Sequence, residues 1–152
     1  MENWPLDEVV VDAGVPFRVP LVSYDGLPVS NKPLIGEFDL VSKLPDGTIA
    51  IIDWKTAARK WPADKASKDF QATCYLYAGW REKRMNPGKT LFRYDVITKT
   101  EKPSVTRHPT MRKHDHFQRM LKLVAAVENA IKAEAFLPNP TSFFCGDCVY
   151  AA

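Results

Sequence analysis

Apolar and polar residues alternate in short segments of the first part of the chain, and this pattern predicts β-strands. Residues 8–22 are rich in β-branched and apolar side chains around Gly14, which is typical of a strand with a break or of a hairpin. Two further strands are expected at Leu34–Lys43 and Thr48–Lys55. The Pro-Asp-Gly turn between them suits a three-residue hairpin loop with its glycine in the left-handed conformation.

Apolar residues recur at helical spacing in the later part of the chain. A helix is expected from about Asp64 or Ser67 to Lys83, with Asp64 or Ser67 as its cap. Residues 91–98 (LFRYDVIT) predict another strand, and a long helix is expected from about Thr110 to Ala135. This order predicts an α/β fold, in which a small mixed β-sheet with a central hairpin is flanked by helices.

The length of 152 residues predicts a single domain over residues 1–152. The net charge of +3 permits a nucleic-acid partner without requiring one. There is no run of about 18 apolar residues and no signal-peptide pattern, so we expect no membrane span and a cytoplasmic location. The three cysteines, Cys74, Cys145 and Cys148, make a poor disulfide framework.

The second strand of the hairpin carries the candidate chemistry. Both of its faces are apolar up to Ile52, which predicts a central, buried strand, and Asp53 and Lys55 then share one face at its end. A buried charge costs several kcal/mol unless it is paired or binds a metal. A three-residue loop places Asp39 opposite Asp53, and Glu37 opposite Lys55.

Two carboxylates in directly opposed positions repel each other, and a divalent cation between them removes that penalty. Two alternatives stay open at this point. Asp39 and Lys55 could form an ordinary surface ion pair at a solvated strand end. A loop of two or four residues would instead turn Asp39 to the other face of the hairpin.

Three motifs follow one another along the chain: Gly36-x-x-Asp39, Asp53-x-Lys55-Thr56 and Gln71-x-x-x-Tyr75. Their order and spacing resemble the PD-(D/E)XK nuclease superfamily. They most resemble its RecB-like exonuclease branch, which includes lambda exonuclease relatives and CRISPR-associated exonucleases. The match runs from about Glu8 to the C-terminus. Each motif alone is weak, but together they are fairly specific.

The resemblance implies a metal-dependent DNA nuclease that hydrolyses phosphodiester bonds. Asp39 and Asp53 would ligate Mg²⁺ or Mn²⁺ together with the backbone carbonyl of Trp54. Lys55 would orient the attacking water and stabilise charge on the phosphate. The glutamine and tyrosine of the third motif lie on one helix face and would contact the DNA strand or water. We expect an exonuclease that acts on DNA ends or single strands in recombination, repair or phage DNA processing.

The sequence departs from this branch at both ends. The branch usually has an N-terminal helical segment with a further metal ligand, whereas the first 33 residues here are expected to be extended; Glu8 is a possible substitute. Cys145 and Cys148 resemble the start of a C-terminal cysteine cluster, but an iron–sulfur cluster needs four ligands, so none is expected. Two other functions therefore stay open: a nuclease-like domain that only binds nucleic acid or a partner protein, and a structure-specific endonuclease.

Basic residues suggest where DNA could bind. Arg59, Lys60, Lys65 and Lys68 lie near the candidate centre in sequence and could follow a phosphate backbone, or could be ordinary solvated residues. Trp61 could stack on a base or cover the sheet edge. A helicase or recombination protein is a possible partner. A second cluster, with the same two interpretations, consists of Arg107, Arg112, Lys113 and Arg119 beside His108, His114 and His116.

Overall fold

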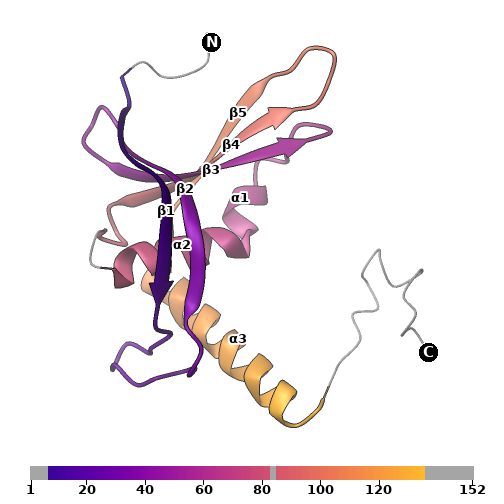
Figure 1. The fold of residues 1–152 in the computed structure, drawn as a ribbon. Helices are drawn as coiled ribbons and strands as arrows, with labels where there is room; N and C mark the ends of the chain where they lie inside the picture. The colour runs from indigo at the N-terminus through magenta and orange to yellow at the C-terminus, as the bar shows by residue number, and fades with distance from the viewer. Residues whose placement is uncertain (1–6, 83–84, 136–152) are drawn as a thin grey trace, which may run out of the picture.

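The computed structural model describes residues 7–82 and 85–135. They form one five-stranded sheet in the order β1-β2-β3-β4-β5, with three helices (Figure 1). The pair β3–β4 is parallel and the other pairs are antiparallel, so the mixed sheet and the α/β class are as expected. The strands are β1 (Val9–Val19), β2 (Leu34–Lys43), β3 (Ile49–Ala57), β4 (Thr90–Thr98) and β5 (Val105–Thr110); the helices are α1 (Lys65–Lys68), α2 (Phe70–Arg81) and α3 (His114–Lys132).

Strand β3 is the centre of the sheet, as its apolar sequence predicts. Ala50, Ile51 and Ile52 are fully buried. The parallel pairing of β3 with β4 requires a crossover, which α1 and α2 supply. The chain therefore leaves the C-terminal end of β3 and passes through α1 and α2 before it enters β4.

The β2–β3 hairpin has the expected turn and register. Gly47 has a φ of 84°, and Leu44 N–H donates to the carbonyl of Thr48. The pairing runs in the expected register, but it ends at Leu40–Ile52. Beyond that point β2 pairs only with β1, so the expected pairings of Asp39 with Asp53 and of Glu37 with Lys55 are both wrong. Glu37 lies opposite Pro16 instead.

The helix expected from residue 64 or 67 to 83 is two helices. Asp69 interrupts it with an extended backbone (φ −72°, ψ 132°), and its side chain accepts a hydrogen bond from Gln71 N–H at the start of α2. Asp69 is therefore the true cap, in place of Asp64 or Ser67. The side chain of Asp64 caps nothing, and the Ser67 hydroxyl donates to the Asp64 carbonyl.

The long helix begins at His114, so its expected start at Thr110 is wrong. Residues 105–110 instead form β5, which pairs with β4. β5 is an edge strand, the position in a sheet where a residue such as Pro109 is tolerated. The helix ends at Lys132, and Glu134 then takes a positive φ of 53°.

The main core lies between the sheet and the helices. Ile51 and Phe92 from the sheet pack there with Leu76 of α2 and Phe117 of α3. A smaller cluster on the opposite side of the sheet contains Leu40, Ala50 and Ile52. Strand β2 changes sides at Asp39, because Phe38 belongs to the main core whereas Leu40 belongs to the smaller cluster.

Gly36, the glycine of the first motif, allows an aromatic ring to approach the backbone. A Cβ atom at this position would lie 2.5 Å from Cζ of Phe17, whose ring packs on Phe38 with centroids 4.7 Å apart. We expect Gly36→Ala to lower the free energy of unfolding by about 1–3 kcal/mol, the usual cost of overpacking. Urea denaturation measures this loss. Gly88→Ala is the control, because a Cβ there meets nothing closer than 3.5 Å, and equal stability of the two variants would contradict the explanation.

Candidate active site

Asp53 is the centre of the candidate site. It follows the buried part of β3 and is only 1% exposed. Its Oδ1 accepts a hydrogen bond of 2.8 Å from Nε2 of Gln71 on α2. Its Oδ2 lies 2.7 Å from Nζ of Lys55, whose side chain is 35% exposed. The carboxylate is thus held inside the protein, with a lysine on the solvent side.

The surroundings of Asp53 disfavour its negative charge. Burial raises the pKa of this carboxyl above its ordinary value of 3.8, and the nearby carboxylates of Asp39 and Asp69 raise it further. The ammonium of Lys55 opposes this shift and lowers the pKa. Since two like charges act on a buried acid, an additional cation would stabilise the ionised site.

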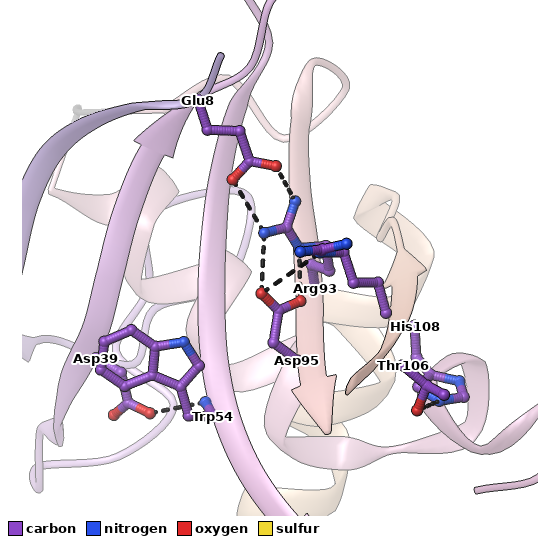
Figure 2. Close-up of polar contacts among 8 residues, drawn as sticks. Glu8, Asp39, Trp54, Arg93, Asp95, Thr106 and His108 are labelled. Carbon is purple, nitrogen blue, oxygen red and sulfur yellow. Dashed lines mark hydrogen bonds and ion pairs between the residues drawn. The ribbon is translucent and has the colours of Figure 1, made fainter. Parts of the chain in front are cut away.

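Asp39 lies where β2 and β3 separate. Its Oδ2 accepts a hydrogen bond of 2.9 Å from the backbone N–H of Trp54, as Figure 2 shows. The carboxylate takes the place of a β2 backbone acceptor just after the last paired residues, Leu40 and Ile52. This contact holds Asp39 beside Trp54, the residue that follows Asp53 in β3.

Gln71 and Tyr75 project from one side of α2, as their spacing predicts. Gln71 is the residue that reaches Asp53. Tyr75 is half-buried, and its ring lies 5.7 Å from those of Phe17, Phe38 and Phe92 in edge-on contacts. Burial raises the pKa of the Tyr75 hydroxyl, and a hydrogen bond with Gln71 opposes that rise.

Tyr94 is a neighbour of the site that the sequence pattern did not single out. It pairs with Asp53 across the parallel β3–β4 ladder and is fully buried. The ammonium of Lys55 lies 5.9 Å from the centroid of its ring. Burial raises the pKa of the Tyr94 hydroxyl, so the group stays neutral beside the carboxylates.

Arg112 determines where α2 begins. It is only 2% exposed, so the expected place in a solvated or DNA-facing basic cluster is wrong. Its Nη2 donates to the carbonyls of Ala66 and Asp69, at the break between α1 and α2. Its other hydrogen bonds, made by Nε and Nη1, are to the hydroxyls of Thr73 and Thr110 and the carbonyl of Met111. These bonds hold the segment that leads into α2, the helix that carries Gln71.

Glu8, the suggested additional metal ligand, forms an ion pair instead. Its Oε1 lies 2.6 Å from Nη1 of Arg93, and Nε of Arg93 lies 2.7 Å from Oδ1 of Asp95 (Figure 2). Arg93 and Asp95 alternate along β4 with Tyr94, so their side chains lie on the opposite side of the sheet from Asp53. Glu8 therefore cannot complete a metal site at Asp53.

The donor set of the site suits a hard cation. In the described part of the chain, the buried Oδ2 of Asp53 has no hydrogen-bond donor other than the Lys55 ammonium 2.7 Å away. Carboxylate and carbonyl oxygens are the ligands that Mg²⁺ and Mn²⁺ prefer. Within residues 7–82 and 85–135, however, no group of three or more His, Cys, Asp or Glu side chains could hold a metal ion.

Cys74, Trp61 and the basic and histidine residues named from the sequence lie in different parts of the fold. Cys145 and Cys148 lie outside the described residues, and Cys74 packs on the main core, where burial raises the pKa of its thiol to about 11. Trp61 lies edge-on to Tyr94 at 5.1 Å, under the ammonium of Lys65. Arg59 and Lys60, which follow β3, and Lys68 on α1 have exposed side chains. His108 belongs to β5, and His114 and His116 belong to the first turn of α3.

Within the described residues, no helix has the length and apolar character needed to cross a membrane.

Residues 6–152 match the family model of the PD-(D/E)XK nuclease superfamily. No curated protein matches the sequence. Among solved structures, the crystal structure of SSO0001 aligns with a TM-score of 0.49 and 14% identity over 92% of this chain and 56% of that one. A candidate exonuclease from Eubacterium rectale aligns with a TM-score of 0.47 and 14% identity over 92% of this chain and 50% of that one. The chain thus spans about half the length of these two proteins. The family match over residues 6–152 shows that the chain belongs to the PD-(D/E)XK nuclease superfamily.

Proposed function

We propose that the chain is a metal-dependent deoxyribonuclease whose centre consists of Asp39, Asp53 and Lys55. We further propose that it acts as an exonuclease on DNA ends or single strands, as the RecB-like motif order implies. The observation that carries the proposal is the buried Asp53 carboxylate, held by Gln71 and Lys55 beside the like charge of Asp39. A functional role explains the cost of this buried charge better than a structural one, because acids with perturbed pKa values cluster at functional sites.

Asp39, Asp53 and the carbonyl of Trp54 would hold a Mg²⁺ or Mn²⁺ ion. When bound, such an ion polarises a phosphoryl oxygen and lowers the pKa of water at the site. Gln71 keeps Oδ1 of Asp53 in place, and this carboxylate would supply one of the ligands of the ion. No third side-chain ligand is assigned, and solvent commonly completes the shell of Mg²⁺.

Lys55 would serve the phosphate and the attacking water. Its side chain is partly exposed, and its ammonium lies against Asp53 Oδ2. The ammonium can therefore turn toward a phosphate that is bound on the solvent side. Its positive charge would stabilise the negative charge that develops on the phosphoryl group, which is the largest effect open to a protein side chain here. Tyr75 would help to position Gln71, because its hydroxyl is hydrogen-bonded to the Gln71 side chain.

We expect Lys55→Ala to lower the rate of DNA cleavage about a hundredfold, because a preorganised charge at the phosphate is lost. The measurement uses end-labelled linear DNA and closed circular DNA, single- and double-stranded, with Mg²⁺ or Mn²⁺. Lys43→Ala is the matched control, since Lys43 is an exposed lysine at the hairpin end of β2. Equal activity of both variants would contradict the role of Lys55.

The same substrates separate the other functions. Degradation of linear DNA alone supports the exonuclease, whereas cleavage of closed circles indicates a structure-specific endonuclease. Among the residues that the structure describes, no three potential ligand side chains are grouped to hold a metal ion, which favours the second candidate, a domain that binds nucleic acid or a partner protein. Folded protein that binds DNA and cleaves no substrate would establish that candidate. Stimulation by an added helicase or recombination protein would test for a partner.

A further inference from the structure

A second concave site lies where α1, α2 and the first turns of α3 meet. The cavity has a volume of about 360 Å³. The side chains that give it its character are Lys68, Asp69, Phe70, Arg112, His116 and Arg119. Two features distinguish this site from an ordinary surface depression: an excess of cationic groups and an exposed aromatic ring.

The cationic groups outnumber the single carboxylate. Lys68 pairs with Asp64 only at the exposed surface, where such a pair contributes about 0–1 kcal/mol and is easily exchanged. Arg119 forms no ion pair with any carboxylate in the described ranges. Arg112 donates its hydrogen bonds to groups inside the protein and contributes its positive charge to the cavity. Asp69 is engaged at the start of α2 and lies close to Arg112.

Phe70 supplies the aromatic ring. It is the first residue of α2, it is 46% exposed, and it lines the cavity instead of joining the main core. Cationic groups that follow a backbone, together with an aromatic face, are the combination that binds single-stranded nucleic acid. An unpaired base can stack on such a ring, whereas a base inside a duplex cannot reach it.

Two consecutive residues of α2 connect the cavity with the proposed catalytic centre. Phe70 lines the cavity, and Gln71 donates to the Asp53 carboxylate. We propose that the cavity binds one unpaired nucleotide of the strand that the centre cleaves, with Phe70 against the base and Lys68 and Arg119 on the adjoining phosphate. This assignment rests on the proposed nuclease function and specifies its substrate as single-stranded.

A protein partner is the competing occupant. Leu123 lines the cavity and continues as a stripe of exposed apolar residues, Val127 and Ile131, along α3. The nucleic acid is favoured because the cations lie at the end of this stripe nearest to Gln71, where an apolar partner would bury them. The two occupants respond differently to the same substitutions.

The test is binding of fluorescein-labelled oligothymidylate, and of a duplex of equal length, to the full chain in EDTA over a range of salt concentrations. Phe70→Ala is expected to weaken single-strand binding about tenfold and leave duplex binding unchanged, and Phe70→Trp to restore it. Arg119→Gln is expected to reduce the slope of log K against log salt by about 0.7 for the single strand. Lys122→Gln, the same charge change on α3 but away from this cavity, is expected to have no effect.

Wild-type affinity in both Phe70→Ala and Arg119→Gln would overturn the proposal. So would equal losses for single strand and duplex in Phe70→Ala, or a changed oligomeric state of that variant with intact single-strand binding, which would indicate a protein contact. Thermal melting confirms that the variants are folded. Because binding is measured without metal, these outcomes leave the cleavage results for Lys55→Ala independent: the cavity can fail while the nuclease stands.

Discussion

Asp53→Asn is expected to reduce DNA cleavage by more than about a thousandfold, because it removes the charge that holds the cation and with it the chemistry the cation supplies. The neutral amide has nearly the same shape, so Gln71 and Lys55 can keep their places. We therefore expect the loss to appear in the rate of cleavage far more than in the affinity for DNA. Single-turnover cleavage and DNA binding, measured separately, distinguish the two effects.

The same substitution is expected to stabilise the protein in the absence of metal. Burial raises the pKa of Asp53 in the folded state above its ordinary value of 3.8, so the folded protein holds that proton more tightly than the unfolded chain. The stability that this provides is present below the ordinary pKa and is lost as the pH rises through the folded-state pKa. At pH 7 the wild type therefore carries a penalty that Asp53→Asn does not.

Thermal unfolding in EDTA between pH 4 and 8 measures this difference. The gap between Asp53→Asn and wild type is expected to narrow toward acid pH, and the stabilisation of wild type by millimolar Mg²⁺ is expected to be absent from the variant. Asp46→Asn is the control, and it is expected to lower stability at pH 7 where Asp53→Asn raises it. The reason is that hydrogen bonding by the backbone of Thr48 lowers the pKa of Asp46. A less stable metal-free Asp53→Asn at pH 7, or an unchanged response to Mg²⁺, would contradict the proposed metal site.

Arg112→Ala is expected to cause the largest loss of stability, about 3–5 kcal/mol. It removes a buried guanidinium and leaves the carbonyls of Ala66 and Asp69 and the hydroxyl of Thr73 without their donor. Urea denaturation at pH 7 measures this loss. Arg119→Ala, an exposed arginine seven residues later, is expected to change stability by no more than about 0.5 kcal/mol.

Arg112→Lys separates the charge of Arg112 from its geometry. A lysine keeps the positive charge but cannot bond the two carbonyls and the hydroxyl in the planar arrangement of a guanidinium. We expect intermediate stability and a lower cleavage rate, because the start of α2 and the direction of Gln71 are no longer fixed. If Arg112→Lys were as stable and as active as wild type, the charge alone would account for the role of this residue.

The features that the sequence predicted well are those with local causes. The turn around Gly47 and the alternation of side chains set the β2–β3 register, and the register placed Asp39 next to the end of β3. The spacing of Gln71 and Tyr75 placed both side chains on one side of α2. Each of these results follows from interactions within a few residues or across one hairpin.

The features that the sequence did not predict depend on distant partners. The break between α1 and α2 is held by Arg112, which lies 43 residues beyond Asp69. Strand β5 has a polar sequence with Pro109, and only its pairing with β4 makes it a strand. Glu8 remained a possible metal ligand in the sequence, because nothing near it in the chain indicated its true partner, Arg93, which lies 85 residues away. Tyr94 was recognisable as a strand residue, but its position beside Asp53 depends on the parallel pairing.

The ion pair of Glu8 with Arg93 and Asp95 has a consequence for the order of folding. Glu8 is synthesised 85 residues before Arg93, so β1 and β2 can pair long before this ionic contact is available. Contacts of such large sequence separation form slowly, because a long loop must close first. Once the contact is made, separating β1 from the sheet would leave a buried guanidinium without one of its carboxylates, at a cost of about 3–5 kcal/mol. We therefore expect the contact between the start of β1 and β4 to form late in folding and to couple the unfolding of the two strands.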